Sequence, residues 1–396
     1  MIDQTGTGRI YATNIYSASE WQEVAPVLAH LAVDLTDGSF FLSPAWVNTW
    51  LQVFGSLLGT KILIFAKNKQ IVGACLLTER TIRRGPFAVR RIYLNTAGED
   101  EQDSVCAEFT ALLCRQGSER QVTAQLAEYL RHCNWDEIVI DSISSDSCLM
   151  FLNKDLSGTS VELSTALSRF IDLNLLRRSG AAYEATLGPR TRRNYRRSVR
   201  LYGGLCLEAT RDVAGTLRML DELIDLHQRT WRERGEVGSF ASESFTDFHR
   251  QLIKVAFPID NIHLIRVFSS DRTVGVVYLF SWRKTVYAYQ CGFRYEDDSR
   301  YQPGLATWVE AIRYFLSQGY DKFRFLGKDM FYKQALTSSY DDCIWLTIRK
   351  KNVKMNILLM LVWAKRYFSQ VLRRLGAVQV RKLPRTPGTE ATPDIE

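Results

Sequence analysis

The stretch that decides the fold runs from Thr285 to Lys333: TVYAYQCGFRYEDDSRYQPGLATWVEAIRYFLSQGYDKFRFLGKDMFYK. Its first residues, 285–291, are rich in aromatic and β-branched side chains and predict a strand. Pro303 and Gly304 then open an amphipathic segment that predicts a helix as far as Ser317. A second strand is expected over residues 323–326. The order strand, helix, strand predicts an α/β unit.

The start of the expected helix suits a phosphate group. Gly304 has no side chain, so a ligand can approach the backbone closely there. The N–H groups of a first helical turn are unpaired and attract anions. A strand edge, an anion site and a loop of titratable residues therefore follow one another within this stretch.

Six motifs accompany this arrangement. They are Tyr-x-Tyr-x-x-Gly-Phe at 287–293, Pro-Gly at 303–304, Phe-x-Phe-Leu-Gly-x-Asp at 323–329, Tyr-Lys at 332–333, Leu-His-Gln-Arg-Thr-Trp at 226–231 and an arginine-rich segment at 192–197. Over about residues 20–350 the chain resembles the GNAT acyltransferase superfamily. Within it, the motifs resemble the CelD-type acetyltransferases of cellulose and exopolysaccharide clusters, which are related to the Fem peptidyltransferases. Tyr301 stands where that superfamily has Arg or Gln, which removes one phosphate-binding side chain.

The resemblance implies an acyl-CoA co-substrate, such as acetyl-CoA, and no metal. The residues expected to bind the coenzyme are Tyr289, Gln290, Cys291, Tyr301, Gly304, Leu305 and Ala306. Among the catalytic candidates, His227 or Asp329 would accept a proton, and Tyr332 and Lys333 would serve the leaving thiolate or the oxyanion. The residues expected to bind substrate or an anion are Arg193, Arg197, Arg229 and Trp231. Cys291 reads as a buried strand cysteine rather than a nucleophile.

The chain also repeats itself weakly. Residues 63–77 and 264–279 both read as hairpins with a glycine, Gly73 or Gly275, at the same place. Residues 134–140 likewise match 319–325. The expected fold class is therefore α/β, a tandem of two GNAT-like modules with mixed, mainly antiparallel sheets flanked by helices. Residues 1–160 would form a non-catalytic module and 161–350 the acyltransferase module, with the boundary near 153–168.

The two modules differ where the coenzyme would bind. After its strand at 91–94, the first module carries Glu99, Asp100, Glu101 and Asp103, and these carboxylates would repel a pyrophosphate. The second module carries the Pro-Gly turn instead. Coenzyme binding is therefore expected in the second module alone.

The composition favours anionic partners, since the formal net charge is +8. The arginine-rich segment at 188–200 is either a solvated helix face or a clamp for the coenzyme, an anionic acceptor or tRNA. The eight cysteines show no metal-ligand spacing and read as reduced thiols. Together with the lack of a signal peptide, this leads us to expect a cytoplasmic protein.

The C-terminal part is expected to form a basic amphipathic helix over 351–383, followed by a disordered tail over 384–396. The helix either docks on the second module or contacts an anionic membrane through residues 351–375, which would place the protein at the inner membrane surface.

The expected function is acyl transfer within a ternary complex, to an amine or a saccharide hydroxyl, in exopolysaccharide or cell-envelope metabolism. Two alternatives stay open: a Fem-like aminoacyl-tRNA-dependent transferase, and a non-catalytic scaffold in polysaccharide assembly. The sequence does not identify the acceptor.

Overall fold

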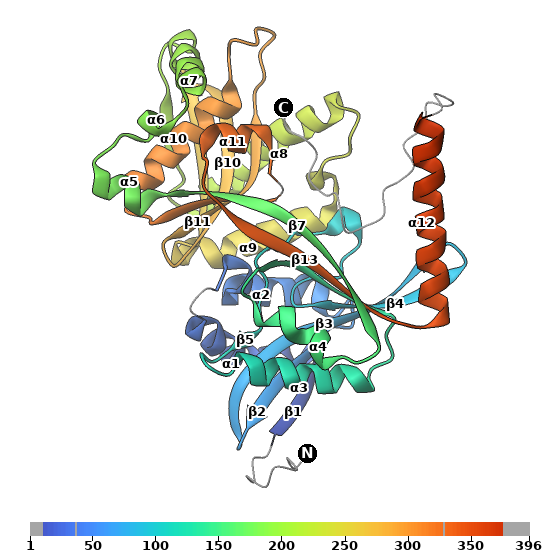
Figure 1. Ribbon diagram of the computed structural model, residues 1–396. Coiled ribbons are helices and arrows are strands. Elements are labelled where there is room, and N and C mark those ends of the chain that lie inside the picture. The colour runs from blue at the N-terminus through green and yellow to red at the C-terminus, as the bar shows by residue number, and fades with distance from the viewer. Residues whose placement is uncertain (1–10, 36–37, 328, 375–396) are drawn as a thin grey trace. The chain divides into compact units, whose positions relative to one another are not determined.

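The computed structural model describes residues 11–35, 38–327 and 329–374 (Figure 1). The chain divides into two compact units. Unit 1 takes in the described residues up to Gly38, then Phe54–Thr165, and those from Ile344 on. Unit 2 takes in Ser39–Val53 and Ala166–Cys343.

Unit 1 is built on a mostly antiparallel sheet with the strand order β1-β2-β3-β4-β6-β13, in which β4 and β6 are parallel. Its strands are β1 (Tyr11–Ser17), β2 (Lys61–Lys67), β3 (Gln70–Arg84), β4 (Phe87–Leu94), β5 (Leu113–Cys114, paired with β3), β6 (Glu137–Ser144) and most of β13 (Tyr340–Lys350). Its helices are α1 (Trp21–Asp34), α3 (Glu119–His132), α4 (Leu152–Asp155) and α12 (Val353–Arg374).

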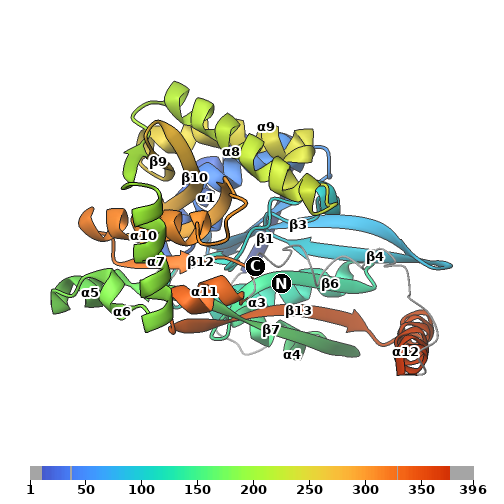
Figure 2. The ribbon, with the colours of Figure 1, turned by 90° about the horizontal axis from the view of Figure 1, so that it is seen from above.

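Unit 2 has the strand order β8-β9-β10-β11-β12-β7, with β11 and β12 parallel. Its strands are β8 (Cys206–Ala209), β9 (Ile262–Ser269), β10 (Arg272–Trp282), β11 (Thr285–Phe293), β12 (Lys322–Phe325) and the second half of β7 (Thr159–Asp172). Its helices are α2 (Pro44–Trp50), α5 (Leu173–Ser179), α6 (Tyr183–Thr186), α7 (Pro189–Leu201), α8 (Val213–Glu233), α9 (Glu243–Ala256), α10 (Pro303–Ser317) and α11 (Phe331–Leu336). Helices α8 and α9 cover one face of this sheet, whereas α10 covers the other with α5, α6 and α7 beside it (Figure 2).

The two units repeat one topology, so the expected α/β tandem is confirmed. In each, an antiparallel series of strands leads into a helix and then a parallel strand: β1–β4, α3 and β6 in unit 1, and β8–β11, α10 and β12 in unit 2. The two expected hairpins are β2–β3 and β9–β10. A Cβ atom added at Gly73 would lie 2.6 Å from Val122 of α3, and one added at Gly275 would lie 2.5 Å from Thr307 of α10. Both glycines therefore let the following helix pack closely on the sheet.

The units are not contiguous in sequence, in contrast to the expected division at residues 160 and 161. Residues Ser39–Val53 belong to unit 2 because their aromatic rings pack there. Phe40 stacks on Phe280 with ring centroids 4.4 Å apart, and Trp46 meets Phe248 edge to face at 4.9 Å. The other division falls between Thr165 and Ala166, inside β7, and not in a loop.

Helix α12 belongs to unit 1, where Met355 and Leu358 are buried against Val89 of β4. It therefore does not dock on the second module. The parts of the expected C-terminal segments at 375–383 and 384–396 lie outside the described residues. None of the helices in the described ranges is both long and apolar enough to cross a membrane.

Candidate active site

Strand β11 has an open edge in its second half. Its parallel pairing with β12 ends at Ala288 and Phe325, while β11 continues to Phe293. On the other side, β10 stays paired, with a β-bulge in which Tyr289 is the extra residue between Ala288 and Gln290. Bulges of this kind bend a strand and often lie next to functional sites. Backbone groups from Tyr289 onward thus face a position that no strand of the described chain occupies.

The side chain of Tyr289 points away from this opening. Its hydroxyl lies 3.1 Å from Nε2 of His249, within a cluster of aromatic rings on the α9 side of the sheet. Burial lowers the pKa of His249 to about 3, so this imidazole is neutral. The expected role of Tyr289 in coenzyme binding therefore rests on its backbone.

The start of α10 lies on the other face of the same strand. Gly304 packs against the Phe293 ring: a Cβ atom added at this glycine would lie 3.3 Å from a carbon of that ring. No side chain of the described residues caps this helix, and its first turn contains no acidic residue. Ala306 N–H donates back to the carbonyl of Gln302, whereas Gly304 and Leu305 belong to the first turn, whose N–H groups have no intrahelical acceptor.

The turn before α10 is anchored on α7. Tyr301 donates its hydroxyl to the carbonyl of Leu201 at 3.2 Å, and the backbone N–H of Gln302 donates to Oγ of Ser198 at 3.1 Å. The Tyr301 side chain is thus engaged with α7 and does not replace the family's Arg or Gln as an anion ligand. Its contribution here is to fix the position of the α10 start.

Four titratable side chains gather around Cys291. Tyr332, Tyr295, Lys333 and Arg234 lie close enough to the Cys291 thiol or to each other to shift one another's pKa. Burial raises the pKa of Cys291 to about 12, which the charges of Lys333 and Arg234 oppose. Burial also raises the pKa of Tyr332 well above its usual range. At neutral pH this cluster therefore holds a thiol, two phenols that keep their protons, and two cations.

Lys333 is a nearly buried cation on α11. Its Nζ donates to the carbonyl of Leu326, at the end of β12. The side chain is only 4 % exposed. Of the sequence-predicted site residues, the structure thus brings together Cys291, Tyr332 and Lys333. Arg234 and Tyr295 were missed, because the loops that carry them have no distinguishing pattern.

His227 has partners for both ring nitrogens. The indole N–H of Trp231 donates to Nε2 at 2.7 Å, and Nδ1 lies 3.0 Å from Oε1 of Gln228. Burial lowers the pKa of His227 to about 4. This imidazole is therefore neutral, with its lone pair already accepting a hydrogen bond. Arg229, two residues further along α8, is exposed and points away from this pair.

Asp329 is held in an ion pair. Its two carboxylate oxygens accept from Arg169 of β7 at 2.6 and 3.0 Å, and Gln334 donates to one of them at 2.9 Å. The hydrogen bonds from Arg169 hold the pKa of Asp329 below its usual range. Such a carboxylate is a weak base. Its partner Arg169 could not be found from the sequence, since 160 residues separate the two.

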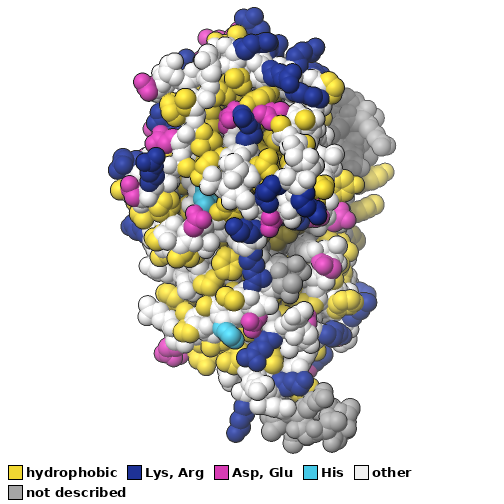
Figure 3. Space-filling model, turned by 90° about the vertical axis from the view of Figure 1, so that its left-hand side faces the viewer, with side chains coloured by type: hydrophobic (Ala, Val, Ile, Leu, Met, Phe, Trp, Pro, Cys, Tyr) yellow, Lys and Arg dark blue, Asp and Glu magenta, His cyan; other side chains and the backbone are white. Residues whose placement is uncertain are grey.

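The α7 arginines form a cationic surface. Tyr195 and Ser198 turn one face of this helix inward, and Tyr195 donates to Glu310 of α10 at 2.5 Å. Arg190, Arg193, Arg196 and Arg200 are exposed, and no ion pair joins them to another described residue. Arg197 lies partly buried near Asp298. Lys and Arg side chains are frequent on the upper part of the face in Figure 3, the side on which α5–α7 lie in Figure 1.

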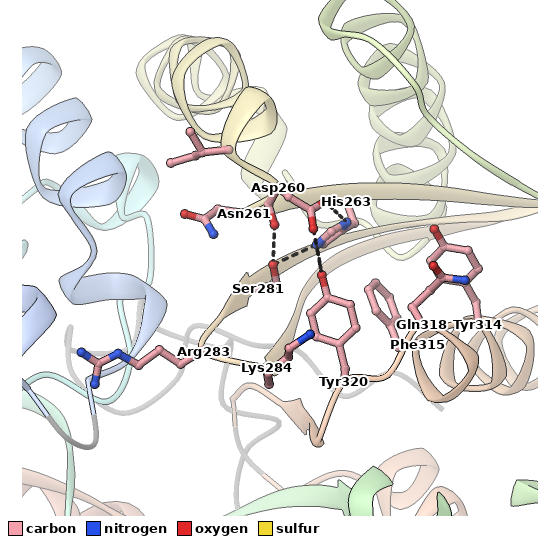
Figure 4. Close-up of a pocket in the computed structure, with 11 residues that line it drawn as sticks. Asp260, Asn261, His263, Ser281, Arg283, Lys284, Tyr314, Phe315, Gln318 and Tyr320 are labelled. Atoms are coloured by element: carbon pink, nitrogen blue, oxygen red, sulfur yellow. Dashed lines mark hydrogen bonds and ion pairs between the residues drawn. The ribbon is translucent and has the colours of Figure 1, made fainter.

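A separate pocket of about 320 Å³ lies at the other end of β11, near the C-terminal end of α10 (Figure 4). In it, His263 Nε2 lies 2.9 Å from Oγ of Ser281, which donates to the backbone carbonyl of Asp260 at 2.7 Å. Tyr320 donates to the Asp260 carboxylate at 3.3 Å. Because the Ser281 proton is directed to a carbonyl, this serine is not activated as a nucleophile. These hydrogen bonds connect β9, the end of β10 and the residues that follow α10.

The corresponding helix start in unit 1 carries a negative side chain. Helix α3 begins with Glu119, whose carboxylate accepts from the backbone N–H of Gly117 at 3.0 Å. Asp100, one of the expected repelling carboxylates, accepts from Arg80 at 2.7 Å. Among the described residues, the start of α3 is thus uncapped like that of α10, but it carries a carboxylate at its first residue. No group of three or more potential ligands for a metal ion occurs in the part of the chain that the structure describes.

Residues 189–334 match the family model described as an acetyltransferase (GNAT) domain. The matched residues include β11, the start of α10 and the Tyr332–Lys333 pair. This part of unit 2 is thus a GNAT acetyltransferase domain, and the protein is an acyltransferase. The match does not single out the CelD-type branch.

Among solved structures, the chain is similar to that of FemX, with 10% sequence identity, a TM-score of 0.54 and coverage of 81% of this chain and 95% of that one. At this identity the similarity shows the fold. A tandem GNAT protein from the clavulanic acid biosynthesis pathway matches at 12% identity with a TM-score of 0.46, covering 87% of this chain and 99% of that one. No curated protein sequence matches the chain.

Proposed function

We propose that unit 2 transfers an acyl group from an acyl-CoA, such as acetyl-CoA, to an amine or a hydroxyl group. One observation carries the proposal: the open edge of β11 and the uncapped start of α10 adjoin the cluster that contains Tyr332 and Lys333. The strand edge offers backbone hydrogen bonds to a thioester, and the helix start offers N–H groups to a pyrophosphate. The donor would thus bind with its reactive end near the cluster.

In this arrangement the acceptor attacks the thioester carbon directly, forming a tetrahedral oxyanion. The Lys333 ammonium would stabilise the negative charge that develops there. When the intermediate collapses, the C–S bond breaks and the leaving thiolate takes a proton from Tyr332, whose raised pKa keeps it protonated until that step. The proton that the acceptor nitrogen or oxygen gives up would then restore the Tyr332 phenol. In the state described, both ring nitrogens of His227 have hydrogen-bond partners and the Asp329 carboxylate is paired with Arg169, so both residues would instead fix the surroundings of the site.

Unit 1 would play no part in coenzyme binding. Its equivalent helix start holds the Glu119 carboxylate, which would repel a phosphate at close range. The acceptor is proposed from the sequence resemblance: a saccharide of an exopolysaccharide or of the cell envelope, modified on the cytoplasmic side. The basic surface of α7 would suit an anionic acceptor of this kind.

Calorimetry with acetyl-CoA and with its unreactive desulfo analogue tests the site. The variant Gly304→Glu should abolish binding, because it places a carboxylate at the phosphate position. Gly304→Ala is the matched control, since it adds only the Cβ atom that meets Phe293. It should fold and retain most of the affinity. Equal binding by the parent and Gly304→Glu would disprove this coenzyme site.

The exposed, unpaired arginines of α7 favour one second candidate, a transferase that uses aminoacyl-tRNA as donor. Replacing Arg190, Arg193, Arg196 and Arg200 by Gln should then weaken tRNA binding and its salt dependence, while acetyl-CoA gives no heat of binding. Tight coenzyme binding without tRNA binding would support the acyl-CoA proposal. A folded protein that binds neither ligand would be a non-catalytic scaffold.

A further inference from the structure

Helix α12 carries two separate apolar stripes. The first consists of Met355, Leu358 and Val362, spaced by three and four residues, and it packs on Val89 and its neighbours in the β3–β4 hairpin. Figure 1 shows α12 beside the far end of this hairpin. Docking to unit 1 therefore accounts for the first stripe only.

The second stripe is exposed. Its members are Val353, Ile357, Met360, Leu361, Trp363, Tyr367 and Phe368. Trp363 is 65 % exposed, Phe368 63 % and Met360 61 %. At 3.6 residues per turn these positions fall on one side of the helix, facing away from the docked stripe. A contiguous exposed surface of seven apolar side chains, several of them aromatic, is typical of an interaction site.

The charges along the helix are all of one sign. Its sequence contains Lys354, Lys365, Arg366, Arg373 and Arg374 and no Asp or Glu. Lys354 pairs with Asp136 of unit 1. Lys365 is exposed, as is Lys351 just before the helix. The apolar surface therefore has a basic border and suits an anionic partner.

The aromatic content of the stripe indicates which partner. Trp363 and Tyr367 stack with ring centroids 5.5 Å apart, and Phe368 lies next to them. Trp and Tyr favour the boundary between lipid tails and headgroups. A second copy of the chain would bring like charges together, whereas anionic headgroups bring opposite charges to the same residues.

We propose that α12 binds the surface of an anionic membrane, lying in the plane of the headgroups with the second stripe in the acyl boundary. The first stripe keeps the helix attached to unit 1 during binding. This contact would hold the enzyme at a lipid surface independently of the chemistry in unit 2.

Co-sedimentation of the full chain with lipid vesicles tests the proposal. One set of vesicles contains phosphatidylcholine alone, and the other adds phosphatidylglycerol. The parent should bind the anionic vesicles at least about tenfold more tightly, and added salt should weaken that binding. The double variant Trp363→Ser, Phe368→Ser should lose most of it. The matched control is Leu57→Ser, which removes an apolar side chain that is 83 % exposed elsewhere in unit 1.

A pair of charge-reversal variants tests the electrostatic contribution to vesicle binding separately. Lys365→Glu should weaken binding to anionic vesicles severalfold, and Lys69→Glu, in the exposed turn between β2 and β3, should not. Equal sedimentation of the parent with both kinds of vesicle, or equal binding by the double variant, overturns the proposal. So does a dimer in analytical ultracentrifugation that the double variant dissociates, because the stripe would then be a contact between two copies of the chain.

Discussion

Lys333 places a positive charge inside unit 2, next to the end of a strand. Its ammonium group is nearly excluded from water and donates to the Leu326 carbonyl. A buried cation is costly unless a hydrogen bond or a negative charge compensates it. In the free protein the Leu326 carbonyl and the nearby Asp329 carboxylate compensate the charge in part, and a developing oxyanion would do so more fully. The position thus suits stabilisation of a transition state more than of a ground state.

The variant Lys333→Met should therefore cut acyl transfer by about 10²-fold and leave coenzyme affinity nearly unchanged. Single-turnover rates and calorimetry on the same preparations separate the two quantities. Lys284→Met is the control, because this exposed lysine precedes the opposite end of β11. A Lys333→Met enzyme with parental turnover would leave the oxyanion to the backbone of β11.

At this scale the sequence predicts contacts between residues that follow adjacent strand ends. Cys291 ends one strand motif, and Tyr332 and Lys333 follow the next, so their proximity could be expected. The partners of His227 and Asp329 could not. Trp231, which is expected to bind substrate, donates its indole N–H to His227, and Arg169 comes from a strand with no motif of its own. Residue type indicates which groups can act as bases, but hydrogen bonding decides which ones are free.

Helix α8 packs directly on β11 because Gly292 has no side chain. An added Cβ atom would lie 2.7 Å from the carbonyl oxygen of Leu223 and 2.8 Å from Cβ of Leu226. Both neighbours belong to the rigid helix and cannot move aside easily. This contact also sets the distance between His227 and the strand that forms the candidate site.

The variant Gly292→Ala should therefore destabilise the protein by roughly 1–3 kcal/mol. Urea unfolding at equilibrium measures the change. Gly304→Ala makes the same chemical change where the nearest atom is a Phe293 ring carbon at 3.3 Å, and it should cost clearly less. If the two variants were equally stable, α8 would have to shift freely along the strand.

The hairpins and the helix after each could be predicted, because strand composition, turn residues and helix signals are local. The bulge at Tyr289 could not, since a register shift depends on two strands at once. The sequence also does not show that the two units share chain segments. The last strand of each unit, β13 in unit 1 and β7 in unit 2, comes from a chain segment that also has residues in the other unit.

At the scale of the molecule, two buried histidines, His227 and His249, and the partly buried His263 are neutral. Desolvation lowers the pKa of His227 to about 4, of His249 to about 3 and of His263 to about 4, from 6.5. Below pH 6.5 the unfolded chain takes up protons at these positions, whereas the folded chain does not. Their contribution to stability is therefore complete above that pH and declines as the pH falls towards 4.

We expect the urea midpoint to fall steadily between about pH 6.5 and about pH 4.5. His249→Phe should flatten this dependence, because it removes one of the groups that titrate only in the unfolded chain. His30→Gln, at an exposed position, should leave the slope unchanged. A midpoint that stays constant over this interval would show that the three imidazoles take up protons as readily in the folded protein as in the unfolded chain.

The placement of Ser39–Val53 in unit 2 has a consequence for how the protein can be dissected. A fragment that starts at residue 161 contains every residue proposed for chemistry, yet it lacks Phe40, Phe41 and Trp46. Those rings cover Phe280 and approach Tyr289, the residue at the bulge. The excised fragment would expose an aromatic surface to water and lose support beneath the strand that is proposed to align the thioester. Unit 2 is thus discontinuous in the sequence, and a fragment intended to reproduce it would need residues 39–53 joined to it by a linker.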